Sequence, residues 1–164
     1  MSRPKIKVKL DRIDWMLEAV TFVFLVVMIG IALLAYGELP ETIPTHFNLQ
    51  GKADGFSGKS GILVMPGIGL LLYVGLIVVN RFPHIFNYPV EITAENAERQ
   101  YRLASKMIRT LNMVTAGIFC YITYQMVHSA QSGTGGLGTL FTPVLLILTL
   151  LPIIIYYIQA KRKQ

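Results

Sequence analysis

Long apolar runs alternate with short polar segments along this chain of 164 residues. The runs cover residues 15–36, 62–80, 108–128 and 139–158. A helix rises about 1.5 Å per residue, so about 20 apolar residues cross the roughly 30 Å hydrocarbon core of a bilayer. The pattern therefore predicts an all-α membrane protein with four transmembrane helices, forming a single domain over residues 1–164.

The start of the first run indicates how its helix begins. Asp11 and Asp14 predict the helix start, because carboxylates accept hydrogen bonds from free N–H groups in a first turn.

A cleavable signal peptide is the competing interpretation of the first run, since residues 35–37 (AYG) loosely resemble a cleavage site. The run is too long for a signal peptide and contains Glu18, so a retained helix is favoured.

Glu18 is the only acidic residue inside an apolar run. Carboxylates at membrane depth are costly and often functional. Glu18 lies about one turn inside the interface, however, where an ion pair is the simpler expectation. Arg12, Lys106 and Arg109 are its candidate partners.

The polar segment 38–61 lies between the first two runs and is rich in turn-forming residues. Residues 44–48 suit an extended strand, and residues 52–57 are placed to pair back through a turn at 49–51. We therefore expect a short extracytoplasmic loop or β-hairpin. In a regular strand, His46 and Asn48 would share one face with Pro44.

The cytoplasmic segment 81–107 is predicted to begin with an extended piece that ends at residues 87–89 and to continue as an amphipathic helix that leads into the third span. Thr93 is its expected N-cap. Glu98 and Arg102 are four residues apart, in the favourable order for a helical ion pair. Later in the chain, the uncharged linker 129–138 (SAQSGTGGLG) predicts a flexible connection to the fourth span.

The distribution of basic residues predicts the orientation. Thirteen of the 15 Lys and Arg residues fall in the N-terminal segment, residues 81–109 and the C-terminal tail, and two fall in the 38–61 loop. Basic residues favour the cytoplasmic side, so both termini are expected in the cytoplasm and the loop outside. The net charge of +6 does not indicate nucleic-acid binding, because no groove-reading motif accompanies it.

Polar and aromatic side chains in two places suggest a ligand-binding site. The loop contributes three of them, and the outer half of the third span contributes a stripe at helical spacing. The candidate residues are His46, Asn48, Asp54, Tyr121, Tyr124, Gln125 and His128. The stripe would form the floor of an outward-facing pocket with the loop as its lid. The alternatives are a purely structural hydrogen-bond cluster, an ordinary exposed loop, and interfacial tyrosines without a pocket.

Neither a metal nor a cofactor is expected. The loop has one histidine, whereas zinc is normally held by three or four well-placed ligands. The chain also lacks the HExxH, GxSxG, P-loop and GxGxxG motifs, which disfavours catalysis. Its single cysteine, Cys120, excludes an internal disulfide.

The loop resembles the signature of a bacterial membrane domain of unknown function found at the N-terminal part of SdpI-type immunity proteins. The residues that carry the resemblance are Leu39, Pro40, Ile43, Pro44, His46, Phe47, Asn48, Gly51, Asp54, Gly55 and Lys59. Residues 87–101 also resemble the loop and helix of stand-alone members. The resemblance implies a multi-pass bacterial plasma-membrane protein. The role associated with SdpI-type proteins is immunity to a secreted peptide toxin, together with signalling to a cytosolic repressor.

These observations favour a non-enzymatic bacterial integral membrane protein that recognises an extracytoplasmic peptide or envelope signal. Its expected partners are the lipid bilayer, such a peptide, and a cytosolic or membrane protein. The alternative is a small-solute or ion transporter, or an accessory subunit of a membrane complex. A transporter would need a polar path across the bilayer, which the apolar first and fourth spans disfavour in a monomer.

Overall fold

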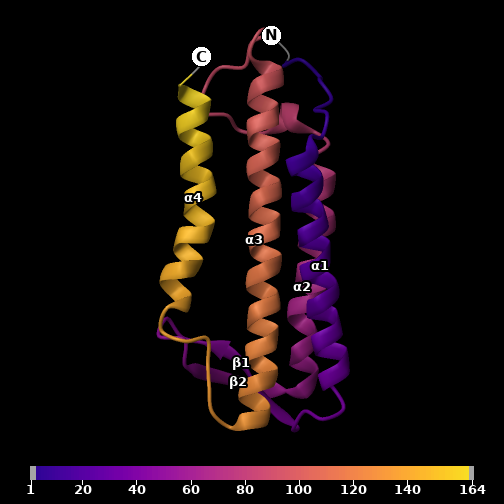
Figure 1. The fold of residues 1–164 in the computed structure, drawn as a ribbon, viewed down its shortest axis with the longest axis vertical. Coiled ribbons are helices and arrows are strands. Elements are labelled where there is room, and N and C mark those ends of the chain that lie inside the picture. Colours follow the sequence, from indigo (N-terminus) through magenta and orange to yellow (C-terminus); the bar gives the residue numbers. More distant parts are fainter. Residues whose placement is uncertain (1–2, 163–164) are drawn as a thin grey trace.

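The structure is a computed structural model that describes residues 3–162. Four α-helices form an elongated bundle, and a two-stranded sheet lies at one end of it (Figure 1). The two ends of the described chain lie at the opposite end of the bundle. We call these two ends the hairpin end and the terminal end. The prediction of four helices with a hairpin between the first two is confirmed, and three of the four predicted membrane spans are found as candidate spans.

Helix α1 (Arg12–Ala35) begins as its sequence predicts. The side chain of Asp11 accepts a hydrogen bond of 3.0 Å from the backbone N–H of Asp14. The side chain of Asp14 in turn accepts one of 2.9 Å from the N–H of Asp11. This reciprocal capping box satisfies two backbone donors that would otherwise lack partners.

The hairpin pairs β1 (Thr42–Phe47) with β2 (Ala53–Gly58) in antiparallel fashion. The register shifts on both sides of His46, which indicates bulges there. As a result Pro44 is buried while His46 is exposed. The prediction that Pro44 and His46 share one face is therefore wrong, because the bulges break the regular alternation of the strand.

Helix α2 (Val64–Val79) follows the hairpin through the 3₁₀ turn η1 (Lys59–Leu63). A second 3₁₀ turn, η2 (Pro83–Ile85), lies in the connection that returns the chain to the next helix. This connection runs across the terminal end of the bundle (Figure 1).

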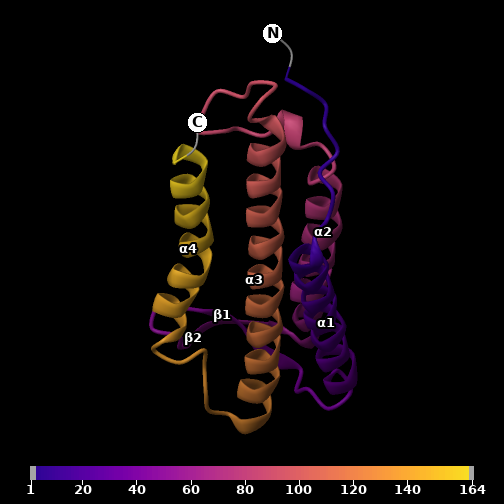
Figure 2. The ribbon, with the colours of Figure 1, turned by 45° about the horizontal axis from the view of Figure 1, so that its top comes forward.

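Helix α3 (Ala97–Ser132) is one continuous helix of 36 residues at the centre of the bundle (Figure 2). The predicted amphipathic segment and the third span are thus parts of a single helix. Thr93 lies in the turn that precedes it, and the N-cap is Asn96. The helix ends at Gly133, whose left-handed backbone (φ +66°) lets its N–H donate to the carbonyl of Ser129. The prediction of a flexible linker from residue 129 is therefore wrong for its first four residues, which are helical.

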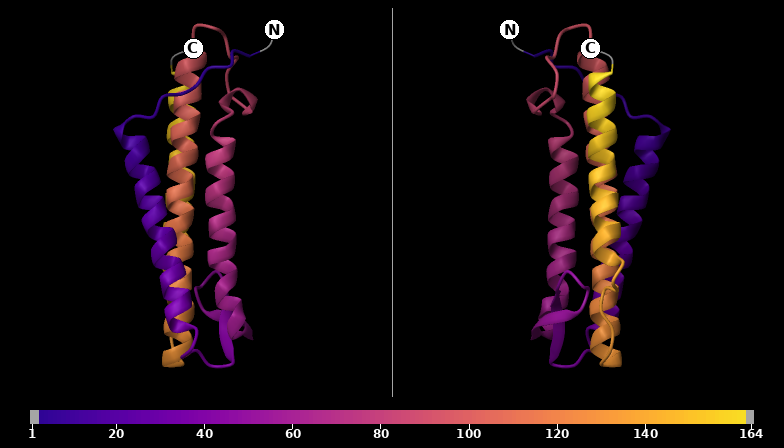
Figure 3. Two further views of the ribbon diagram at one scale, coloured as in Figure 1. Left: turned by 90° about the vertical axis from the view of Figure 1, so that its right-hand side faces the viewer. Right: turned by 90° about the vertical axis from the view of Figure 1, so that its left-hand side faces the viewer.

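Three segments of the described chain are long and apolar enough to span a membrane: α1, residues Lys59–Val79, and α4 (Phe141–Lys161). These helices surround α3 (Figures 2 and 3). Helix α3 is less apolar because it directs polar side chains into the bundle. Its buried polar residues are Gln100, Ser105, Arg109, Asn112 and Thr123. The chain is thus a multi-pass membrane protein whose central helix carries most of the buried polar side chains.

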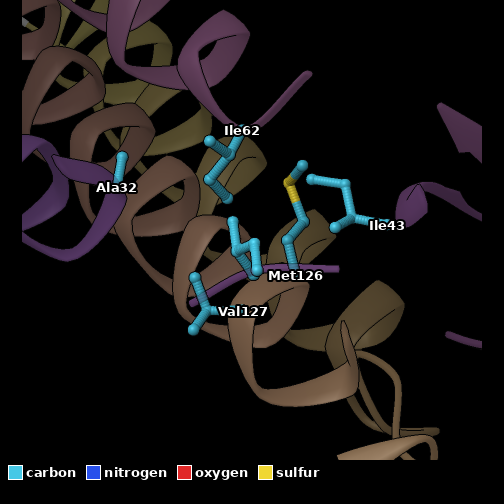
Figure 4. Close-up of a cluster of buried hydrophobic side chains, with 6 residues drawn as sticks. Ala32, Ile43, Ile62, Met126 and Val127 are labelled. Carbon is cyan, nitrogen blue, oxygen red and sulfur yellow. The ribbon is translucent and has the colours of Figure 1, made fainter. Parts of the chain in front are cut away.

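Apolar clusters hold the bundle together at several levels. The cluster at the hairpin end joins Ile43 of β1 to Ile62 of η1 and to Met126 and Val127 of α3 (Figure 4). Ile43 and Ile62 are fully buried. Burying an isoleucine side chain contributes about 1.5–3 kcal/mol, so this cluster fixes the hairpin on the end of α3.

Candidate ligand-binding site at the hairpin end

The hairpin presents an exposed histidine–carboxylate pair. Nδ1 of His46 lies 2.5 Å from Oδ1 of Asp54 across the two strands. The side chains are 73% and 43% exposed, so the pair adds little to stability. When Asp54 accepts the Nδ1 hydrogen, the second ring nitrogen, Nε2, can accept a hydrogen bond from a ligand. Both residues were predicted as members of a ligand-binding site in this loop, and the structure brings them together.

Asn48 organises the turn between the strands. Its Oδ1 accepts hydrogen bonds of 3.0 Å from the N–H groups of Gln50 and Lys52. Gly51, at the centre of this turn, has a positive φ of +74°. The side-chain oxygen of Asn48 is therefore used within the loop, and a ligand would meet its Nδ2 group instead.

The predicted stripe on α3 divides into two pairs. Gln125 Nε2 donates to the hydroxyl of Tyr121 at 2.9 Å and to the carbonyl of Gly136 at 2.7 Å. The Tyr121 hydroxyl donates to the carbonyl of Leu137 at 3.0 Å. Tyr121 and Gln125 thus fasten the linker between α3 and α4 to the side of α3.

Tyr124 and His128 form the second pair of the stripe. Their rings stack with centroids 6.0 Å apart, and Tyr124 is half exposed. Within residues 3–162, no hydrogen bond joins this pair to His46 or Asp54. The structure thus contains both halves of the predicted site, but places the hairpin pair and the α3 stripe in separate contacts.

The linker pairs with the turn of the hairpin, which the sequence did not predict. The N–H of Leu137 donates to the carbonyl of Gly51 at 2.8 Å, and Lys52 forms an antiparallel bridge with Gly136. Gly136 approaches so closely that a Cβ there would lie 2.2 Å from the Gly51 oxygen. The run of glycines in the linker was the available signal, because it permits such close contact of two backbones.

Helix α4 is fastened to the same turn. The hydroxyl of Thr142 donates to the carbonyl of Leu49 at 2.7 Å. Phe141 stacks on Tyr121 with ring centroids 5.7 Å apart. The hairpin, the end of α3 and the start of α4 therefore form one connected unit.

A groove of about 520 Å³ lies between the hairpin and the end of α3. Its volume is within the range of about 300–1,000 Å³ that is usual for ligand sites. Hydroxyl, ammonium and backbone groups line it together with one aromatic ring. The lining residues are Thr42, Pro44, Lys52, Ala53, Phe56, Ser129, Ala130, Gly133, Thr134 and Gly135. Within the described chain, no group of three or more His, Cys, Asp or Glu side chains is placed to hold a metal ion.

The buried charges lie near the terminal end, far along the bundle from this groove. Arg109 Nε lies 3.1 Å from Oε1 of Glu18, which confirms that Glu18 is held in an ion pair. Arg109 Nη1 also approaches Oδ1 of Asp14 at 3.7 Å, which is too long for a hydrogen bond. Lys106 Nζ lies 2.5 Å from Oδ2 of Asp11. These contacts join the start of α1 to α3.

Residues 23–70 match the domain of unknown function DUF1648, which here comprises the second half of α1, the hairpin, η1 and the start of α2. This match bears out the domain-of-unknown-function part of the resemblance, and the SdpI part stays a prediction. The chain is 26% identical over 140 residues to an uncharacterized protein of the archaeon Archaeoglobus fulgidus, covering 77% of this chain and 75% of that protein. No solved structure matches the chain.

Proposed function

We propose that this chain is a non-enzymatic plasma-membrane protein of a prokaryote that recognises a peptide or another envelope signal at its hairpin end. In this proposal α3 also crosses the bilayer, as the third of four spans, and is surrounded by α1, α2 and α4. Both termini lie in the cytoplasm, and the hairpin lies outside. The excess of basic residues at the terminal end supports this orientation.

The observation that carries the proposal is the groove between the hairpin and α3. It offers Lys52 for a carboxylate, hydroxyl groups for backbone amides, and Phe56 for an apolar side chain. Phe56 is 62% exposed, although a ring of this size gains by burial. An extended peptide presents carboxylates, backbone amides and apolar side chains along one strand, so its chemistry fits the lining.

The hydrogen bonds that attach the hairpin turn to its neighbours suggest how ligand binding would affect the rest of the protein. The hairpin turn is bonded to the linker by Leu137 and to α4 by Thr142. A ligand that moves the hairpin would therefore also move the start of α4. In the proposed orientation α4 ends in the cytoplasm, where a partner protein could respond to its position.

The test compares two substitutions in the same loop. Cells that produce the protein are exposed to secreted antimicrobial peptides, and survival is compared with cells that lack the gene. Phe56→Ala should abolish any protection, because it removes the ring that lines the groove. Leu49→Ala is the matched control, since Leu49 is 75% exposed and does not line the groove. Loss of the gene without change in peptide sensitivity or envelope-stress response contradicts the proposal.

A small-solute or ion transporter, or an accessory subunit of one, is the second candidate. The polar residues Arg109 and Asn112, buried in the bundle, favour it. The apolar cluster of Leu25, Met28 and Cys120 opposes it, because these side chains close the space between the helices farther along α3. Solute flux into proteoliposomes distinguishes the two candidates.

A further inference from the structure

The segment before α1 forms an extended arm, residues 3–11, with a regular alternation of exposure. Pro4, Ile6 and Val8 are half-buried, whereas Lys5, Lys7 and Lys9 are exposed. In an extended chain, every second side chain points to the same face and these side chains lie about 6.6–6.8 Å apart. The three lysines therefore form one evenly spaced row on the outer face of the arm.

Contacts at both ends hold the arm in place. At its start, the hydroxyl of Tyr101 donates to the carbonyl of Pro4 at 3.0 Å, and Arg3 Nη1 donates to the carbonyl of Phe86 at 2.5 Å. At its other end, Lys106 binds Asp11. The lysine row is thus presented on a fixed backbone.

The same contacts indicate that the arm runs more across the bundle than along its axis. Pro4 is level with Tyr101 and Asp11 with Lys106, and five residues of α3 correspond to about 7.5 Å along the helix. The seven residues from Pro4 to Asp11 can extend by about 23 Å. Most of that length therefore runs across the bundle, as Figure 3 shows for the indigo segment leaving α1.

The arm lies at the outer edge of the lipid headgroup layer. The polar layer on each side of the hydrocarbon core is about 5–8 Å thick. Trp15, which is 64% exposed at the start of α1, belongs at the border of that layer. The arm ends at Asp11, four residues or about 6 Å of helix before Trp15, and Pro4 lies about 7.5 Å farther out, so the arm runs from the outer edge of the headgroup layer to just above it.

The lysines of the row are not neutralised by the protein. In the part of the chain that the structure describes, Lys5, Lys7 and Lys9 take part in no ion pair, whereas Lys106 and Arg109 do. Basic residues close to a membrane surface gain about 1 kcal/mol each from anionic lipids, over a distance of about one Debye length.

We propose that the row of Lys5, Lys7 and Lys9 binds the headgroups of anionic phospholipids in the leaflet at the terminal end. Lipid is favoured over other polyanions because the arm continues directly into a membrane helix, which keeps the row beside the headgroups at all times. The inward Ile6 and Val8 stabilise the arm, so the lysines meet the lipid phosphates already aligned.

The single tryptophan, Trp15, provides the test. The full chain is reconstituted in vesicles of zwitterionic and anionic phospholipid at equal fractions, with bromine on the acyl chains of one or the other. Brominated anionic lipid should quench Trp15 more strongly than brominated zwitterionic lipid. Each lysine is expected to favour the anionic lipid by up to about fivefold in association constant. The difference should shrink at high salt.

The variant Lys5→Gln/Lys7→Gln/Lys9→Gln should bring the quenching by the two lipids much closer together, leaving only the smaller preference due to other basic residues such as the exposed Arg12. Lys161→Gln/Arg162→Gln is the matched control, because it removes charge at the same end but on α4, and it should keep the difference. Equal emission maxima and melting temperatures show that the variants are folded. Equal quenching by both lipids in the unmodified protein overturns the proposal, as does a preference that is undiminished in the triple variant.

Discussion

The buried ion pairs around Arg109 allow a quantitative test of how α1 is held to α3. The Arg109 side chain is 10% exposed, and those of Asp14 and Glu18 are 2% and 19% exposed. Removing one partner of a buried pair typically costs about 3–5 kcal/mol, because the other charge remains buried without compensation. Arg109→Met leaves two carboxylates in this position. We therefore expect a loss of free energy of unfolding near that range.

The assay is unfolding of the purified protein in detergent micelles, with a matched surface pair as control. Arg102 lies 3.3 Å from Glu98 on the exposed side of α3. Arg102→Met should cost about 0–1 kcal/mol, as is usual for exposed pairs. Adding Glu18→Gln to Arg109→Met should restore part of the stability, because it removes one uncompensated charge. A loss with Arg109→Met no larger than with Arg102→Met would refute the argument.

Two further predictions concern the ends of the bundle. Gly51→Ala should cost about 1–3 kcal/mol in thermal unfolding, because the positive φ disfavours alanine and the new Cβ would lie 2.6 Å from the Gly138 oxygen. Gly37→Ala should be nearly neutral, because a Cβ at Gly37 would have no atom within 4 Å apart from its neighbours in the chain. Equal losses of stability in the two variants would contradict this reasoning. The hydrogen bond from Lys106 lowers the pKa of Asp11 from 3.8 to about 2. A carboxylate whose pKa is lower in the folded state than in the unfolded state stabilises the folded state at pH values above its unfolded pKa. The contribution of Asp11 is therefore complete above pH 3.8 and is lost as the pH falls through about 2. Asp11→Asn should remove that part of the pH dependence of unfolding, and an unchanged profile would show that the pair is not formed.

The positions of the helices could be predicted from the local sequence. Capping carboxylates and apolar runs determine helix formation through interactions between residues that are close together in the chain. The hairpin was predicted from its turn-forming residues for the same reason. The bulges at His46 could not be predicted, because they depend on how β1 fits against β2. A regular alternation therefore placed Pro44 on the wrong face.

The candidate site was predicted less completely, because its contacts join residues far apart in the chain. Glu18 and Arg109 are 91 residues apart, and sequence alone left three partners for Glu18. Glycines of the linker suggested flexibility, yet Gly136 pairs with the hairpin turn. Tyr121 and Gln125 fit a ligand-facing stripe by spacing, but they bind the backbone of that linker.

The central claim is that the hairpin and the two termini lie on opposite sides of the membrane. Its most direct test is labelling of intact cells with a membrane-impermeant thiol reagent. Ser57→Cys, an exposed position in β2, is combined with Cys120→Ala to remove the native thiol. Labelling from outside is predicted for Ser57→Cys, whereas Lys161→Cys should react only after the cells are opened. Reaction of Ser57→Cys only in opened cells would contradict the account.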